Sequence, residues 1–442
     1  MPHDPYPSKA PPSKASPSKT RTPTAHTPEA HPPKTRAPNS PTHSPQTNSS
    51  QTRLIHEGPA RSHHGETSEP IYLTSGFVYE SAEQAEARFR GDLEEAGKFI
   101  YSRYGNPSVG LFEERLRILE GADVCVAMAS GMAAMAASLL CHLRAGDHVV
   151  ASQVLFGSCL QILQTYLPRF GIEVTLVDGT DLRAWDRAIR PGQTKALFCE
   201  TPANPTLALV DIRAVADLAH AHGALLIVDN AFSSPIVQRP MDLGADVVTY
   251  SATKHMDGQG RCMGGSVLCS EAFFTDHLQH YHRHMGPSLS PFNAWSLAKS
   301  LETLELRVTR MADSALTIAQ FLENSPGIQR VLYPGLPSHP QHDLAQAQMQ
   351  SGGSLLAFAV QGDKDSAFAL LNHLNLILIS NNLGDAKTLA THPATTTHRT
   401  LGADGRAAAG IPDSMIRLSV GLESPTDLIQ DLSQAIHATL CA

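Results

Sequence analysis

An aspartate and a lysine each follow an apolar run that is typical of a buried strand. Asp229 ends the run at 224–228, and Lys254 lies shortly after the run at 247–250. Ligand crevices in open α/β sheets lie at the carboxyl ends of the strands, so both side chains are expected at one crevice. Desolvation there lowers the pKa of a lysine and makes its amine a nucleophile. Taken alone, the aspartate would more often cap a helix or turn, and the lysine would more often lie in water.

The aspartate and the lysine together predict one cofactor, pyridoxal 5'-phosphate. A carboxylate at Asp229 would keep a pyridine nitrogen protonated and so make the ring an electron sink. The amine of Lys254 would hold the aldehyde of the cofactor as a Schiff base and then carry protons. Either residue without the other would leave this chemistry incomplete, so the pair carries the functional prediction.

A phosphate group needs backbone amides and hydroxyls, and the sequence offers both. Gly131 and Met132 lie between an apolar run and a predicted helix, where free amides and the helix dipole converge. Ser251 and Thr253 precede the lysine and would donate hydroxyls to the same phosphate. Small residues at such a turn usually serve packing alone, so this signal is weak without the others.

Two arginines have neighbours that suit an anion. Tyr101 and Arg103 are two residues apart, so on an extended backbone their side chains share one face and form an oxyanion clamp. Without context, Arg103 would be an ordinary surface residue. Arg417 lies inside an apolar strand-like run, and its burial needs a partner such as a substrate carboxylate.

Alternating strand-like and helical segments must position these residues. Strand-like runs occur at 124–128, 148–151, 173–177, 196–199, 225–228, 247–250 and 266–269. Helical patterns occur at 82–89, 111–119, 132–143, 157–170, 182–189 and 212–222. This alternation predicts parallel strands in an α/β sheet that is covered on both faces. After residue 302, a helix to 322 and runs at 355–360, 377–380 and 415–420 predict a smaller α+β domain.

The composition narrows the class of protein. A formal charge of −8 over 442 residues argues against general binding to nucleic acid or to an anionic membrane. The longest apolar stretch, 124–143, is interrupted by Ser130 and Gly131, so no membrane span is predicted. The histidines and cysteines lack ligand spacing, so no metal site is predicted. Scattered cysteines, with no apolar leader after Met1, favour reduced thiols in a cytoplasmic protein.

The first 52 residues differ from the rest of the chain. They are rich in Pro, Ser, Thr, Lys and His and nearly lack large apolar residues. Such a segment cannot bury enough surface to offset its ordering entropy, so residues 1–52 are predicted to be disordered. Two interpretations of residues 1–52 are left open: a basic tail that binds a partner, and an extension without a role.

Six ordered strings give the chain a resemblance to a known family. They are YSRYGNP at 101–107, ASGMAA at 129–134, ETPANP at 200–205, VDNAF at 228–232, SATKH at 251–255 and IRLSVGLE at 416–423. Over residues 53–442 the chain resembles the Cys/Met-metabolism family of pyridoxal-phosphate enzymes. The resemblance implies the α/β, aspartate-aminotransferase-like fold type I. It also implies an arm at 53–105 that contacts a neighbouring subunit, a cofactor domain at 106–301 and a C-terminal domain at 302–442.

The resemblance implies a role for each candidate residue. Lys254 would carry the cofactor, and Asp229 would hold its ring nitrogen. Asn204 would approach the ring hydroxyl, and Arg417 would bind the α-carboxylate of the substrate. The implied phosphate contacts are Gly131, Met132, Ser251 and Thr253 within one subunit, and Tyr101 and Arg103 from its neighbour. The active unit would therefore be a dimer, paired into a homotetramer.

Three positions depart from the patterns of similar enzymes. Phe156 stands where many members stack a tyrosine on the cofactor ring, so it can stack but cannot exchange a proton. His255 follows the lysine where tyrosine is frequent, and its effect is left open. Asn382 stands where lyase-like members often carry a serine, which favours the sulfide-using members over the lyases.

Further strings resemble members that join sulfide to an O-acylhomoserine. They are DGQGRCMGG at 257–265, GPSLSPFNAW at 286–295 and NLGDAKTLATHPATTTH at 382–398. The implied reaction converts O-succinyl-L-homoserine and sulfide to L-homocysteine and succinate in methionine biosynthesis. The alternatives are an O-acetyl donor, cysteine as acceptor as in cystathionine γ-synthase, γ-elimination from methionine or cystathionine, and a cofactor-free binding protein with this fold.

Overall fold

A mixed sheet of seven strands forms the larger part of the fold. The computed structural model describes residues 49–57, 62–92 and 98–440, and within them this sheet has the order β1-β7-β6-β5-β4-β2-β3. The strands are β1 (Val124–Met128), β2 (His148–Ser152), β3 (Glu173–Val177), β4 (Thr194–Glu200), β5 (Leu225–Asp229), β6 (Val247–Tyr250) and β7 (Gly265–Cys269). The predicted strands are confirmed, with ends that shift by at most two residues.

The sheet is mostly parallel, with one exception. Strands β2 to β6 pair in parallel, whereas β7 is antiparallel to both β1 and β6. The prediction of a mostly parallel sheet is confirmed, and β7 is the strand that pairs antiparallel. A parallel neighbour needs a crossover, usually a helix, and the segment 251–264 between β6 and β7 contains none.

Helices cover both faces of the larger sheet, as predicted. They are α3 (Pro107–Glu120), α4 (Gly131–Leu140), α5 (Gly157–Gln161), α6 (Leu167–Arg169), α7 (Leu182–Ala188), α8 (Ile212–Ala221), α9 (Glu271–Phe273), α10 (Gln279–Met285) and α11 (Pro291–Leu301). Along β1, Cys125 and Ala127 belong to the core that includes α3, whereas Val126 and Met128 belong to the core that includes α4. This alternation is what a strand buried on both faces requires.

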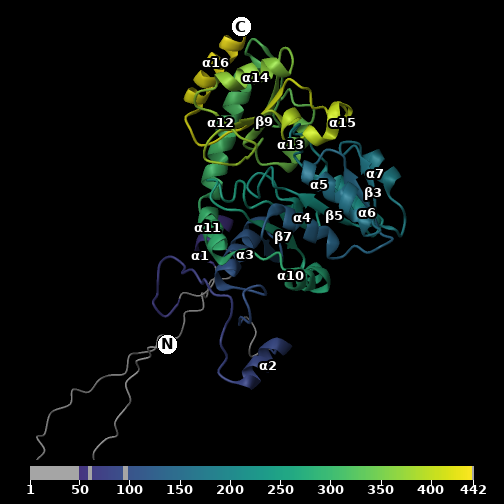
Figure 1. Cartoon of the computed structure of the whole chain (residues 1–442), viewed down its shortest axis with the longest axis vertical. Coiled ribbons are helices and arrows are strands. Elements are labelled where there is room, and N and C mark those ends of the chain that lie inside the picture. The colour runs from purple at the N-terminus through teal and green to yellow at the C-terminus, as the bar shows by residue number, and fades with distance from the viewer. Residues whose placement is uncertain (1–48, 58–61, 93–97, 441–442) are drawn as a thin grey trace, which may run out of the picture. The chain divides into compact units, whose positions relative to one another are not determined.

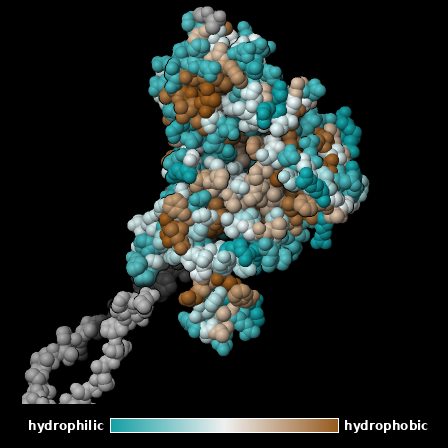
Figure 2. All heavy atoms as spheres, in the orientation of Figure 1, coloured by the Kyte–Doolittle hydropathy of each residue, from teal (hydrophilic) through white to brown (hydrophobic). Residues whose placement is uncertain are grey.

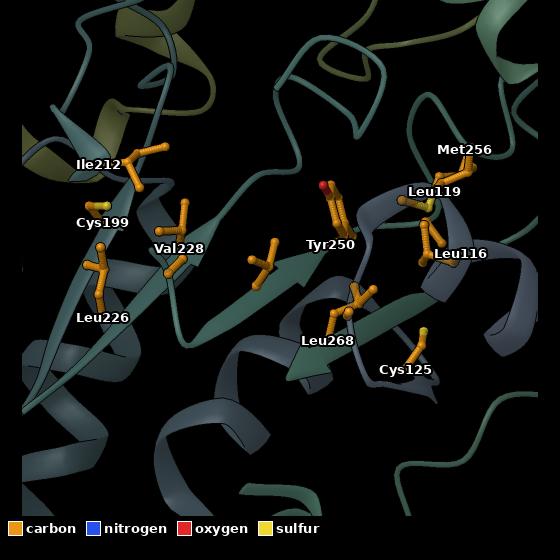
Figure 3. Packing of buried hydrophobic residues seen from close by; sticks show 14 of the residues in the cluster. Leu116, Leu119, Cys125, Cys199, Ile212, Leu226, Val228, Tyr250, Met256 and Leu268 are labelled. Carbon is orange, nitrogen blue, oxygen red and sulfur yellow. The ribbon is translucent and has the colours of Figure 1, made fainter. Parts of the chain in front are cut away.

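Helix α3 illustrates how local sequence sets an element of the core. The side chain of Asn106 accepts a hydrogen bond from the Ser108 amide at 2.9 Å, and Pro107 occupies the first turn. Gly121 ends the helix in the left-handed conformation, with a φ of 80°. Leu116 and Leu119 then point into the core near β1 and β7, as Figure 3 shows.

A second sheet of five strands lies in the C-terminal part. Its order is β10-β11-β12-β9-β8. The strands are β8 (Ile328–Leu332), β9 (Leu355–Val360), β10 (Leu378–Ile379), β11 (Leu389–Thr391) and β12 (Met415–Ser419). The helices are α12 (Leu304–Glu323), α13 (His342–Gln348), α14 (Lys364–His373), α15 (Gly402–Ala408) and α16 (Pro425–Leu440). Helices α12, α14 and α16 pack with this sheet around one apolar core, in the upper part of Figure 1.

Some local predictions need correction. The predicted helix 157–170 is interrupted by a π-helical turn at Ile162–Tyr166, shortly before Pro168. Strands β8 and β11 were not predicted, since β11 has only three residues and β8 is interrupted by exposed polar side chains. Within the described residues, three 3₁₀ turns also occur: Pro240–Leu243, Pro393–Thr395 and Arg399–Leu401. A second π-helical turn spans Phe274–Leu278.

The N-terminal arm has little regular structure. It contains α1 (Ser50–His56) and α2 (Ala82–Arg90), and an isolated antiparallel bridge joins Gly76 to Tyr101. Helix α2 lies apart from both sheets, at the foot of Figure 1. In Figure 2, brown apolar side chains gather beside this helix.

The predicted boundaries remain predictions. Residues 1–48 of the predicted tail lie outside the described residues, and α1 begins at Ser50, just before the predicted boundary at 52. The contacts group Asn48–Ala442 as one compact unit, so a division near 301 stays an expectation.

In the described part of the chain, no helix is both long and apolar enough to cross a membrane.

Candidate active site

A cavity of about 270 Å³ lies at the carboxyl ends of β1, β4, β5 and β6, with β12 as a further wall. Most of the predicted site residues line it: Gly131, Met132, Phe156, Asn204, Asp229, Ser251, Thr253, Lys254 and Arg417. Segments far apart in the sequence therefore meet at one place, as expected for the edge of an α/β sheet. Among the described residues, no group of three or more His, Cys, Asp or Glu side chains is arranged to hold a metal ion.

Lys254 lies four residues beyond β6 and reaches across the cavity. Its Nζ donates a hydrogen bond to Oδ1 of Asn382 at 2.6 Å, which brings the predicted residue Asn382 into the site. Burial, and then the charge of Arg417, lower the pKa of Lys254 to about 8. A larger fraction of this amine is therefore neutral at physiological pH than in an ordinary lysine.

Asp229 is the last residue of β5 and lies within the protein interior. Its Oδ1 accepts a hydrogen bond from the Ala231 amide at 3.0 Å, and the thiol of Cys159 lies 3.9 Å from Oδ2. Burial raises the pKa of this carboxyl, while the Ala231 amide opposes the rise. A cation placed against Asp229 would favour its charged form, and a protonated pyridine ring is such a cation.

A second carboxyl, that of Glu200, lies beside Asp229. Glu200 ends β4 and pairs in register with Asp229 of β5. Its Oε2 accepts a hydrogen bond from the Phe156 amide at 2.6 Å, and its Oε1 accepts one from the Asn204 amide at 3.0 Å. Burial, and then the charge of Asp229, raise the pKa of Glu200. Glu200 was not predicted from the sequence, although it ends a predicted strand as Asp229 does.

Arg417 is buried in β12, as its apolar surroundings predict. Its Nη1 donates to Oδ1 of Asn204 at 3.1 Å, and its Nη2 donates to the carbonyls of Asn381 and Asn382 at 2.9 and 3.0 Å. Its Nε is buried and has no hydrogen-bond partner among the described residues. Burial lowers the pKa of Arg417 to about 10, with Glu200 opposing, so the guanidinium stays charged. An unsatisfied cationic donor in a cavity wall suits a carboxylate ligand.

The residues predicted to bind phosphate lie in the first turn of α4 and in the loop before the lysine. The first turn of α4 contains Gly131 and Met132, and the first amides of a helix lack intrahelical acceptors. A Cβ on Gly131 would lie 2.6 Å from Cβ of Ser251, so only glycine permits this close approach. The Thr253 hydroxyl lies 3.2 Å from the Gly264 carbonyl and 3.1 Å from its amide, so it is already engaged within the chain.

A second cavity, of about 650 Å³, adjoins the first and shares Phe156, Asn381 and Thr397 with it. The other lining residues are uncharged and mostly polar: Gly157, Ser158, Gln161, Ile379, Ser380, Thr391, Thr396 and Thr400. Phe156 is partly exposed where the two cavities meet. The space around Lys254 therefore continues outward between α5 and the β10 to β11 region.

Tyr101 and Arg103 do not reach this cavity within one chain. Tyr101 is exposed. Arg103 donates to the carbonyl of Arg283, and its guanidinium lies 5.4 Å from the centre of the Tyr101 ring and 4.8 Å from that of Tyr104. The predicted contact with a neighbouring subunit therefore stays a prediction.

The fold and the cavity define the class of protein. A mostly parallel α/β sheet with a smaller second sheet, and a desolvated lysine near a buried carboxylate at adjacent strand ends, are features of pyridoxal-phosphate enzymes of fold type I. A family model described as "Cys/Met metabolism PLP-dependent enzyme" matches residues 51–437. This chain belongs to that family.

Known proteins agree with this assignment. An O-succinylhomoserine sulfhydrylase of Mycobacterium tuberculosis is 51% identical over 86% of this chain and 94% of its own length. An L-methionine gamma-lyase of Porphyromonas gingivalis is 41% identical, with coverages of 88% and 97%. The crystal structure of a putative O-acetylhomoserine (thiol)-lyase from Campylobacter jejuni, which contains a pyridoxyl-lysine monophosphate, is 33% identical with a TM-score of 0.83, covering 88% of this chain and 99% of its own.

Proposed function

We propose that this chain converts O-succinyl-L-homoserine and sulfide to L-homocysteine and succinate, a step of methionine biosynthesis. The observation that carries the proposal is the 51% identity over 86% of the chain to a protein named O-succinylhomoserine sulfhydrylase. The relative named as a methionine lyase has a similar coverage but only 41% identity. This difference favours replacement at the γ carbon over elimination.

Lys254 and Asp229 are the residues that we propose to hold pyridoxal phosphate. Lys254 would carry the cofactor as a Schiff base, and its lowered pKa supports attack by a neutral amine. Asp229 would bind the protonated ring nitrogen, and its burial makes such a cation favourable. When bound, the cofactor supplies an electron sink for negative charge on the substrate carbons.

The remaining cofactor contacts follow from the cavity wall. The amides of Gly131 and Met132 and the hydroxyl of Ser251 would bind the phosphate, and Thr253 would join them by giving up a bond to Gly264. In the same site, Phe156 would stack on the ring. Asn204 would approach the ring hydroxyl with its side-chain amide, while its Oδ1 stays bonded to Arg417.

Arg417 and Lys254 would act on the substrate. The free Nε of Arg417, with the charge of its guanidinium, would bind the α-carboxylate and fix the Cα–H bond next to Lys254. The neutral Nζ of Lys254 would remove the α proton, give it up to the cofactor-bound substrate and, neutral again, remove a β proton. Succinate would leave with the electron pair of its bond to the γ carbon, and hydrosulfide would add there. Protons returned to the β and α carbons would then complete homocysteine. Oδ1 of Asn382 would hold the resulting ammonium, since it already accepts a hydrogen bond from Nζ.

A neighbouring subunit would complete the site. We propose that Tyr101 and Arg103 contact the phosphate of a second copy in a dimer, and that two dimers form a homotetramer. The arm supports this proposal, because Leu73, Val78 and Phe89 are large apolar residues left exposed in one chain. We also propose a cytoplasmic location, which is supported by six free cysteines within the described residues.

The decisive experiment is a matrix of acyl donors against sulfur acceptors. Purified protein with pyridoxal phosphate is given O-succinyl- or O-acetyl-L-homoserine with sulfide or L-cysteine, and products are measured by mass spectrometry. We expect the highest kcat/KM for the succinyl ester with sulfide, with homocysteine and succinate formed in equal amounts. Faster formation of cystathionine from cysteine, faster use of the acetyl ester, or 2-oxobutanoate as the main product would each contradict the proposal and identify the corresponding alternative.

A further inference from the structure

We infer that His255 is a positioning residue that fixes Lys254 and Asp229 relative to each other. His255 directly follows Lys254 in the chain, and its side chain is buried beside the turn that follows Asp229. The inference builds on the proposed roles of these two residues as cofactor ligands. It does not depend on which acyl donor or sulfur compound the enzyme uses.

The imidazole links two different parts of the fold. Its Nε2 lies 2.8 Å from Oγ of Ser354, the residue just before β9 of the smaller sheet. On the other side, the carbonyl of Ala231 interacts with the ring and favours its protonated form. The Nδ1 atom has no strict hydrogen-bond partner among the described residues, so this second contact is the looser one.

Ala231 connects the imidazole to the aspartate. Its amide donates to Oδ1 of Asp229 at 3.0 Å, while its carbonyl interacts with His255. One peptide segment is therefore held by the carboxylate on one side and by the imidazole on the other. A displacement of the His255 ring would shift Ala231 and, with it, the orientation of the Asp229 carboxylate.

The backbone that directly follows the lysine is also held. Arg307 of α12 donates from Nη1 to the His255 carbonyl at 2.7 Å and from Nη2 to the Met256 carbonyl at 3.3 Å. A Cβ on Gly384 would lie 2.6 Å from the His255 amide nitrogen and 2.9 Å from its Cγ. The loop that contains Asn382 therefore packs directly on this histidine, so His255 contacts both the large-sheet turn and the loop that accepts the Lys254 hydrogen bond.

The ring is uncharged in this position. Burial, and then the charge of Arg307, lower the pKa of His255 to about 4. A neutral imidazole can hydrogen-bond Ser354 through Nε2, while Nδ1 faces the Ala231 carbonyl without forming a hydrogen bond. It makes these contacts without placing a further cation beside Lys254 and Arg417.

The test uses the holoenzyme and three variants. His255→Phe fills the space but removes both polar contacts, His255→Asn retains an amide donor near the Nδ1 position, and Ser354→Ala removes only the Nε2 partner. The measurements are the visible circular dichroism of the bound cofactor, its dissociation constant, kcat, and KM for O-succinyl-L-homoserine. His148→Asn is the control, because His148 is also buried between two hydroxyls, at 2.8 Å from each, but lies at the start of β2.

We expect His255→Phe to weaken cofactor binding and lower kcat by roughly tenfold each, the effect of one or two lost hydrogen bonds. The circular dichroism band should weaken, and KM should change by less than about threefold, because Arg417 is untouched. His255→Asn should recover part of the lost cofactor affinity and kcat. Ser354→Ala should weaken cofactor binding, kcat and the circular dichroism band as well, but by less than His255→Phe. His148→Asn should lower only the thermal midpoint.

Two results would overturn the inference. One is a folded His255→Phe protein with unchanged cofactor affinity, dichroism and kcat. The other is a set of variants in which only thermal stability falls, as in the His148 control. If His255→Phe does not fold, unchanged cofactor affinity and dichroism in Ser354→Ala would also overturn it. Since these two readouts need no substrate, they remain informative even if the proposed acyl donor is wrong.

Discussion

Oδ1 of Asn204 accepts a hydrogen bond from Nη1 of Arg417 at 3.1 Å, which joins the loop after β4 to strand β12 of the smaller sheet. The Asn204 amide in turn donates to Glu200, which lies beside Asp229. The proposed carboxylate-binding residue and the proposed ring-binding residue are thus connected through two side chains. A substitution at Asn204 or Glu200 is therefore expected to affect both substrate binding and cofactor binding.

The first prediction concerns the covalent attachment of the cofactor. Borohydride reduction of the holoenzyme, followed by peptide mapping, should place the pyridoxyl label on Lys254. Lys254→Ala should bind the cofactor without a reducible bond and lose at least about 1000-fold in kcat, since proton transfer alone contributes 10²–10⁴-fold. Lys299→Ala is the control, because Lys299 forms ion pairs with Glu69 and Glu302 outside the cavity. A label on another lysine would contradict the assignment.

The second prediction is a pH dependence. The pKa of Lys254 is lowered to about 8, so its amine is protonated below that pH and neutral above it. Only the neutral amine attacks the aldehyde, so the rate of covalent cofactor capture by the apoenzyme should rise about tenfold per pH unit up to about 8 and then level off. Stopped-flow absorbance measures this rate. A capture rate that continues to rise up to pH 10 would mean that Lys254 has the pKa of an ordinary lysine, and would contradict the prediction.

The third prediction tests Asn382. Asn382→Asp would place a carboxylate where Oδ1 now accepts the Lys254 hydrogen bond at 2.6 Å. A nearby negative charge stabilises the ammonium form, so the pH profile of cofactor capture should move upward by about 1–2 units. The matched control is Asn381→Asp, since Asn381 binds Arg417 through its backbone carbonyl, not its side chain. Equal shifts in both variants would argue against a specific role for Asn382.

The fourth prediction concerns substrate binding by Arg417. Arg417→Lys keeps the positive charge but removes Nε and the fork of donors, so KM for O-succinyl-L-homoserine should rise by roughly 10–100-fold, the effect of one charged hydrogen bond. Cofactor content should stay close to that of the unchanged protein. Arg187→Lys provides a surface control, because Arg187 pairs with Asp181 in an exposed position. An unchanged KM would place the α-carboxylate elsewhere.

The fifth prediction concerns stability. Glu200→Ala would leave the buried amide of Asn204, and that of Phe156, without their acceptor. Each unsatisfied donor costs about 1–3 kcal/mol, so the free energy of unfolding should fall by roughly 2 kcal/mol or more. Glu200→Gln keeps one oxygen and should lose less. Urea unfolding of the apoenzyme measures both values. An Ala variant as stable as the unchanged protein would mean that water replaces the lost acceptor.

The sequence by itself determined the strands of the larger sheet, the helices between β1 and β5, and the two residues that define the cofactor chemistry. Apolar periodicity and turn residues are local signals, so β1, β3 and β6 were predicted with their observed bounds. Asp229 and Lys254 were recognised because the ends of parallel strands share one edge of a sheet. The motif strings then indicated the family.

The tertiary structure decided the contacts between distant segments. The bond between Lys254 and Asn382 spans 128 positions, and that between Arg417 and Asn204 spans 213, so no local pattern contains them. The position of Glu200 beside Asp229 depends on which strands are neighbours, and the antiparallel β7 depends on the path of the loop before it. Burial sets the lowered pKa of Lys254 and the uncharged state of His255, and burial exists only once the two sheets have packed together.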